Sequence, residues 1–112
     1  MKWYAPECLS SGVFSLASDV WSFGVLLWEM YTLGEAPYED MNAVEVNEFI
    51  ADGKRLPKPD RASNSVYAVM MDCWQFLPSN RPSFKDLLKF FADNPLYANA
   101  IAQDLKRVNL EA

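Results

Sequence analysis

The sequence has no surplus of positive charge. Ten Lys and Arg residues stand against 15 Asp and Glu residues, which gives a formal net charge of −5. A protein that binds nucleic acid through the phosphates needs a basic face, so this balance argues against that class of function. It also offers no polybasic membrane anchor. We therefore expect the partners of this chain to be proteins.

Cysteine is scarce, and histidine is absent. The two cysteines, Cys8 and Cys73, lie far apart and follow no metal-ligand spacing. Each has apolar neighbours, so a reduced and buried thiol is the expected state and a disulfide is the alternative. Reduced thiols suit a cytoplasmic location, and no charged-then-apolar secretory leader is present at the N-terminus.

No apolar run is long enough to span a membrane. The most apolar stretch, Ser15 to Thr32, is interrupted by Asp19 and Glu29, whereas a spanning helix needs about 20 apolar residues. Its apolar residues occupy nearly every face of a helix, so it needs neighbours on all sides. Ser15 is a suitable N-cap and Gly34 a suitable stop. The stretch predicts a central core helix.

Shorter helices are expected on either side of this one. Three kinds of signal locate these helices. One is a proline in the first turn, one is a pair of capping boxes, Asn42 with Glu45 and Ser83 with Asp86, and one is a buried-face periodicity. No segment has the pattern of a strand, and residues 54–63, which contain two prolines, predict a connector. The signals at the helix starts are Pro6, Asn42 and Ser83, and the buried-face periodicity runs from Val66 to Trp74. A final amphipathic helix would carry Tyr97, Ile101, Leu105 and Val108.

Two faces of these helices have a predicted orientation. In the helix after Ser83, the apolar residues are expected to face the core: Phe84, Leu87, Leu88 and Phe91. One face of the central helix, including some of Val20, Phe23 and Leu27, is expected to lie open in this chain. An exposed apolar area of that size would make the chain prone to association.

Several short motifs occur in a characteristic order. They are Trp3-Tyr4-Ala5-Pro6-Glu7, Ser18-Asp19-Val20-Trp21-Ser22-Phe23-Gly24-Val25, Gly34 with Pro37-Tyr38, Cys73-Trp74, and Asn80-Arg81-Pro82-Ser83-Phe84. This order resembles the C-terminal part of a protein tyrosine kinase domain over about residues 2 to 92.

The resemblance implies a fold class and a domain layout. The chain would be mainly α, the helical part of the C-terminal lobe of the two-lobed kinase fold, without the N-terminal lobe and the catalytic loop. Residues 1–92 would be the partial kinase domain and residues 93–112 a C-terminal tail. Lys2-Trp3 before Ala-Pro-Glu resembles tyrosine kinases, and Tyr4 with Glu7-Cys8 is similar to the cytoplasmic spleen tyrosine kinase and Janus kinase groups.

The resemblance also implies roles for single residues. Glu7 and Arg81 would form an ion pair that ties the end of the activation segment to the later helices; two exposed, unpaired charges are the alternative. Asp19 would accept hydrogen bonds from the catalytic-loop backbone, or it would only favour the helix dipole at a helix start. Lys2 and Trp3 would receive the peptide substrate.

The parts that perform catalysis are missing from this sequence. It contains no glycine-rich loop, no Val-Ala-Ile-Lys, no His-Arg-Asp and no Asp-Phe-Gly, which a kinase needs to hold ATP and magnesium and to activate the acceptor. We therefore expect no catalytic residue and no metal ligand in this chain. ATP and Mg²⁺ would belong to the parent domain, which would transfer the γ-phosphate to protein tyrosine, and the chain alone would be inactive.

A second hypothesis is a non-catalytic interaction module. Asn94-Pro95-Leu96-Tyr97 has the form that phosphotyrosine-binding domains bind, and Tyr97-Ala98-Asn99 has a form that adaptors bind after phosphorylation, so Tyr97 is a possible phosphosite. The alternative is that Asn94 caps a helix, Pro95 opens it and Tyr97 packs inward. An unrelated small helical bundle would explain the periodicities but not the ordered motifs.

Overall fold

The computed structural model describes residues 2–94. It contains five α-helices and one short 3₁₀ helix in this range and no strand, as the sequence predicts. The elements are α1 (Pro6–Ser11), α2 (Leu16–Tyr31), α3 (Ala43–Ala51), α4 (Asn64–Cys73), η1 (Pro78–Asn80) and α5 (Phe84–Asp93). No helix within residues 2–94 is long and apolar enough to cross a lipid bilayer.

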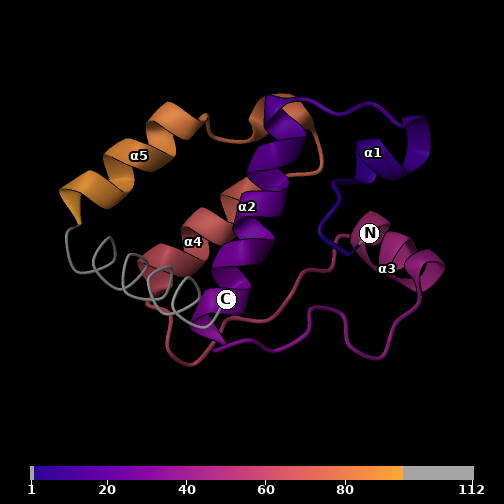
Figure 1. The fold of residues 1–112 in the computed structure, drawn as a ribbon, viewed down its shortest axis with the longest axis horizontal. Coiled ribbons are helices and arrows are strands. Elements are labelled where there is room, and N and C mark those ends of the chain that lie inside the picture. Colours follow the sequence, from indigo (N-terminus) through magenta and orange to yellow (C-terminus); the bar gives the residue numbers. More distant parts are fainter. Residues whose placement is uncertain (1, 95–112) are drawn as a thin grey trace, which may run out of the picture.

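Helix α2 is the centre of the fold. It runs through the middle of the molecule, with α4 beside it, α5 on one side, and α1 and α3 on the other (Figure 1). Its side chains Trp21, Val25 and Leu27 are fully buried. Gly24 allows the closest approach, because a Cβ there would lie 2.7 Å from the Cβ of Cys73 at the end of α4.

The predicted N-caps Ser15 and Asn42 and the predicted stop at Gly34 are confirmed, whereas α4 begins at Asn64, two residues before Val66. The Ser15 hydroxyl accepts from the Ser18 backbone N–H at 3.2 Å and begins α2. Asn42 Oδ1 accepts from the Glu45 N–H at 2.9 Å, and Glu45 returns a bond to the Asn42 N–H at 3.1 Å. After α2, Gly34 takes a positive φ of 96° and donates its N–H to Glu29 O at 2.9 Å, which stops the helix.

The predicted orientation of α5 is half wrong. Leu87 and Phe91 are buried, but Phe84 is 42% exposed and Leu88 is 72% exposed. Helix α5 stands off to one side of α2 (Figure 1), so only one narrow stripe of it reaches the core. Phe84 keeps an edge contact with Phe23, at 6.2 Å between ring centres.

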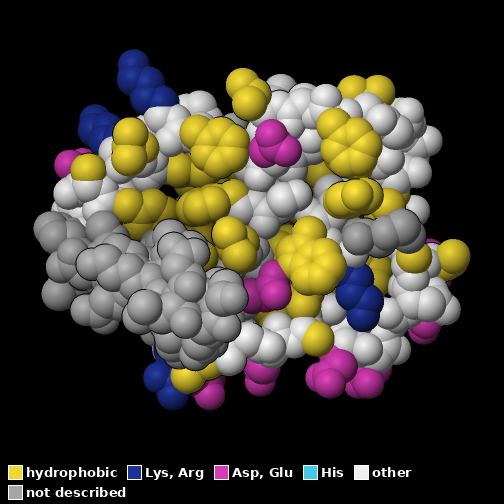
Figure 2. Space-filling model, viewed as in Figure 1, with side chains coloured by type: hydrophobic (Ala, Val, Ile, Leu, Met, Phe, Trp, Pro, Cys, Tyr) yellow, Lys and Arg dark blue, Asp and Glu magenta, His cyan; other side chains and the backbone are white. Residues whose placement is uncertain are grey.

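The predicted open face of α2 is also corrected in detail. Val20 and Leu27 are 1% and 0% exposed and belong to the core, while Phe23 is half-buried. The open positions are Leu16 and Leu26, at 75% and 43% exposure. Figure 2 shows apolar side chains, in yellow, spread across the middle of this face of the molecule. The exposed leucines lie at the first turn of α2 and next to the buried Leu27, so the face that includes Val20 and Leu27 is covered and not open as predicted.

Both cysteines are buried and free, as predicted for reduced thiols. Burial, together with the Asp72 charge, raises the pKa of the Cys73 thiol to about 12. A thiol with so high a pKa stays protonated and unreactive at neutral pH.

Candidate functional site

Glu7 and Arg81 lie 74 positions apart in the sequence and contact each other through two parallel hydrogen bonds. Arg81 Nη1 donates to Glu7 Oε2 at 2.7 Å, and Nη2 donates to Oε1 at 2.8 Å. The Arg81 side chain is fully buried, and that of Glu7 is 22% exposed. This bidentate geometry is the strongest form of the arginine–carboxylate interaction. It fastens α1 to the segment before α5.

The guanidinium of Arg81 uses every N–H that it has. Besides the two bonds to Glu7, Nε donates to Gln75 O at 2.8 Å, Nη1 to Ala17 O at 2.9 Å and Nη2 to Phe76 O at 3.2 Å. Arginine has five N–H donors, and all five are occupied. Arg81 thus joins α1, α2 and the turn after α4 at one point.

The surroundings keep both charges of this pair in place. The guanidinium carbon of Arg81 lies 5.1 Å from the centre of the buried Trp21 ring, a cation–π contact. Partial burial works to raise the pKa of Glu7, but the hydrogen bonds from Arg81 and from the residue's own backbone, with the Arg81 charge, outweigh it. The pKa of Glu7 is therefore lowered, and the carboxylate is ionised at neutral pH.

Of the predicted substrate-binding residues, Trp3 lies against the central helix and Lys2 against the segment that follows it. The Trp3 indole Nε1 donates to a carboxylate oxygen of Glu29, and the Ser22 hydroxyl donates to Trp3 O at 2.7 Å. Lys2 Nζ donates to Tyr38 O at 2.8 Å. The loop is therefore held through polar bonds, while the Trp3 ring stays 41% exposed.

The surface beside this loop is apolar and open. The rings of Tyr4 and Phe14 meet edge to face with centres 5.3 Å apart, and they are 40% and 59% exposed. Val13 is 59% exposed as well. The exposed Tyr4–Phe14 ring pair, in which Tyr4 follows Trp3 directly in the sequence, is called the aromatic patch below.

Asp19 lies in the first turn of α2, and its side chain is exposed. Its carboxylate accepts no hydrogen bond from any of residues 2–94. The position suits the helix dipole. The role toward a catalytic loop remains a prediction, because that loop is not part of this sequence.

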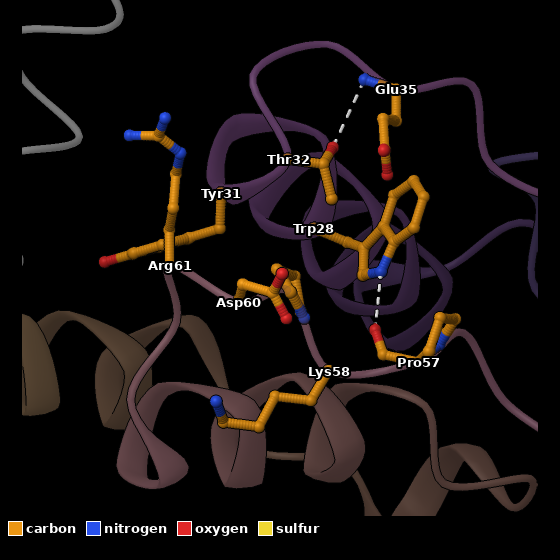
Figure 3. A pocket seen from close by; sticks show the side chains of 9 residues that line it. Trp28, Tyr31, Thr32, Glu35, Pro57, Lys58, Asp60 and Arg61 are labelled. Atoms are coloured by element: carbon orange, nitrogen blue, oxygen red, sulfur yellow. Dashed lines mark hydrogen bonds between the residues drawn. The ribbon is translucent and has the colours of Figure 1, made fainter.

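A pocket of about 250 Å³ that the sequence did not indicate lies between the end of α2 and the connector at residues 57–61 (Figure 3). Trp28 Nε1 donates to Pro57 O at 2.8 Å and closes one wall. The lining carries charges of both signs, Glu35 and Asp60 with Lys58 and Arg61. It contains none of the predicted site residues, and this mixed lining selects no ligand class.

Sequence reasoning missed the partners of the Lys2–Trp3 loop. In the sequence, Glu29 marks only an interruption of the apolar stretch, and nothing places Ser22 or Tyr38 beside Lys2 and Trp3. The sequence carries no signal that separates Glu29, which has a partner, from Asp19 in the same helix, which is exposed and accepts no hydrogen bond from residues 2–94. Tyr97, the predicted phosphosite, lies outside the described residues.

Comparison with known proteins agrees with the resemblance. The family model described as protein tyrosine and serine/threonine kinase matches residues 1–91. Tyrosine-protein kinase Shark of Drosophila melanogaster is 48% identical over 99 residues, which cover 88% of this chain and 10% of Shark. Tyrosine-protein kinase HTK16 of Hydra vulgaris is 44% identical over 97 residues, which cover 87% of this chain and 13% of HTK16.

A receptor is among the relatives too. Fibroblast growth factor receptor 1 of Pleurodeles waltl is 46% identical over 89 residues, which cover 80% of this chain and 11% of the receptor. The chain thus spans only about a tenth of the length of the curated relatives that it matches.

Proposed function

Because the chain belongs to the protein tyrosine and serine/threonine kinase family, we propose that it is the substrate-side, helical part of a tyrosine kinase that phosphorylates protein tyrosine. One observation carries this proposal: the segment with Lys2 and Trp3 is docked on α2 and secured by the buried Glu7–Arg81 pair. An anchored loop beside an open aromatic patch is suited to receiving a peptide.

We propose that ATP and Mg²⁺, the cofactors of the reaction, are held by parts of the parent domain other than residues 2–94. Among residues 2–94, no group of three His, Cys, Asp or Glu side chains could hold a metal ion. The four glycines stand singly and form no phosphate-binding loop. In this proposal the chain contributes peptide binding and the helical support.

The boundaries of the kinase part and the subfamily of the chain are finer points of the proposal. We place the kinase part at residues 1–92 and a tail at 93–112, which is supported by the end of α5 at Asp93. The names of the relatives do not support the spleen and Janus kinase groups, since Shark and a growth factor receptor are among them.

The cellular location and the partners are proposed from the sequence and from the state of the cysteines. A cytoplasmic location of the domain is supported by two free, buried thiols. Partners would be proteins or peptides bearing tyrosine. The proposal that adaptors bind phosphorylated Tyr97 is supported by the sequence of the tail alone.

A chimera tests the proposal. In Drosophila Shark, the 99 matched residues are replaced by those of this chain. We expect the chimera to transfer phosphate from Mg-ATP to a tyrosine peptide. Two controls, Shark without that segment and the purified 112-residue chain, are expected to show no turnover. A folded chimera without activity, beside active Shark, would contradict the proposed function, and stoichiometric turnover by the chain alone would contradict its dependence on the parent.

A further inference from the structure

Three polar bonds hold the Lys2–Trp3 loop, and all of them come from α2 and the turn that follows it. Glu29 accepts from the Trp3 indole, Ser22 donates to the Trp3 carbonyl at 2.7 Å, and the Tyr38 carbonyl accepts from Lys2 at 2.8 Å. These partners lie 26, 19 and 36 positions from the loop residues in the sequence. The loop conformation is thus set by tertiary contacts rather than by the local chain.

Burial alone does not fix the Trp3 ring, because the ring is 41% exposed. Its orientation depends on the bond to Glu29. An indole N–H is a donor only and an ionised carboxylate an acceptor only, so this bond has one possible direction. A bond to an ionised acceptor is also stronger than one between neutral groups. Glu29 is half-buried, and its bond to the Trp3 indole lies at the surface of the molecule.

The acceptor for Lys2 is held in an unusual backbone conformation. Tyr38 has a φ of 51°, in the left-handed region that non-glycine residues rarely adopt. Its ring is buried at 5% exposure and packs edge to face on Phe49, with ring centres 6.0 Å apart. Such a conformation persists where the surroundings over-determine it. The buried ring thus directs the Tyr38 carbonyl to Lys2.

We propose that Glu29 is a positioning residue for the peptide substrate, acting through Trp3. It does not touch the peptide; it holds the Lys2–Trp3 loop in the conformation that receives the residues next to the acceptor tyrosine. Ser22 holds the same loop through a bond from its hydroxyl to the backbone carbonyl of Trp3. This inference rests on the proposed function. A purely structural role for Glu29 would lower stability and leave peptide affinity unchanged.

The first test uses the complete 112-residue chain. In a ¹⁵N-labelled sample, the Trp3 indole N–H resonance is assigned by its loss in Trp3→Phe. We expect Glu29→Ala to move this resonance upfield and to speed its exchange with water, and Glu29→Gln to move it less because an acceptor oxygen remains. The control is Glu48→Ala, which removes an exposed carboxylate of α3. An unchanged Trp3 resonance in Glu29→Ala would overturn the inference.

The second test separates KM from kcat in the Shark chimera. Loss of one charge-assisted bond that orders the loop should raise the KM for a tyrosine peptide about tenfold. The kcat should change by less than about twofold, because no reacting atom is touched. Glu29→Gln should recover part of the affinity, and Glu48→Ala should match the unsubstituted chimera.

The outcomes distinguish the inference from the proposed function. An unchanged KM in Glu29→Ala, or a fall in kcat alone, would overturn the positioning role while an active chimera upholds the function. An inactive unsubstituted chimera counts against the function and therefore against the role. The indole resonance then still decides whether the Trp3–Glu29 contact exists.

Discussion

Replacing Arg81 with alanine is expected to lower the free energy of unfolding by about 3–5 kcal/mol, because a partly buried Glu7 carboxylate loses its counter-charge. The substitution also removes all five hydrogen bonds of the guanidinium and its contact with Trp21. Exposed ion pairs are worth only about 0–1 kcal/mol. The size of the loss therefore distinguishes the observed buried pair from two solvated charges.

Thermal unfolding followed by circular dichroism measures this effect. A loss of this size should lower the Tm by more than about 10 °C in a chain of this length. Arg81→Lys keeps the charge but offers fewer donors, so its Tm should fall between the two. Lys89→Ala, which removes an exposed cation from α5, is the control. A shift of Arg81→Ala no larger than that of the control would defeat the assignment.

The same pair gives the stability a pH dependence. Because the pKa of Glu7 is lowered in the folded chain, its contribution is present above the ordinary carboxyl pKa and is lost as the pH falls through the folded value. The difference in stability between the unsubstituted chain and Arg81→Ala should accordingly shrink on acidification. No such convergence is expected for Lys89→Ala.

Substitution of Gly24 with valine is expected to destabilise the chain by about 3 kcal/mol, at the upper end of the cost of overpacking a core. A Cβ at this position would lie 2.7 Å from Cys73 Cβ and 2.7 Å from Trp74 Nε1. Both neighbours are fully buried, so α2 and α4 would have to separate. Alanine would gain about 1 kcal/mol of helix propensity over glycine, and its net loss should be smaller.

Urea unfolding compares the two variants directly. The midpoint should fall in the order unsubstituted chain, Gly24→Ala, Gly24→Val. Ala43→Val, which adds two methyl groups at an exposed position of α3, should leave the midpoint nearly unchanged. A Gly24→Val midpoint equal to that of this control would show that α2 and α4 are not packed as described.

The local features of the fold could be predicted from the sequence. The capping boxes at Asn42 and Ser83 join residues three positions apart, so neighbouring letters contain the whole signal. The central position of α2 followed from its apolar residues on nearly all sides. The pairing of Glu7 with Arg81 could be anticipated only through the family resemblance, because 74 positions separate the two residues.

The faces of the helices could not be predicted in the same way. Leu87 and Leu88 are adjacent in the sequence and equally apolar, yet one is buried and the other is 72% exposed. Which of them faces the core depends on where α5 lies against α2, which is a tertiary property. The Trp3–Glu29 contact likewise depends on how the loop lies across α2.

The most direct test of this account is the acceptor preference of the Shark chimera. Two peptides that differ only in a tyrosine or a serine at the acceptor position are compared with Mg-ATP, because the matched family includes kinases of both specificities. We expect phosphate transfer to the tyrosine peptide and none above background to the serine peptide. Equal transfer to both peptides, or transfer to serine alone, would contradict the claim that this chain supplies the substrate side of a tyrosine kinase.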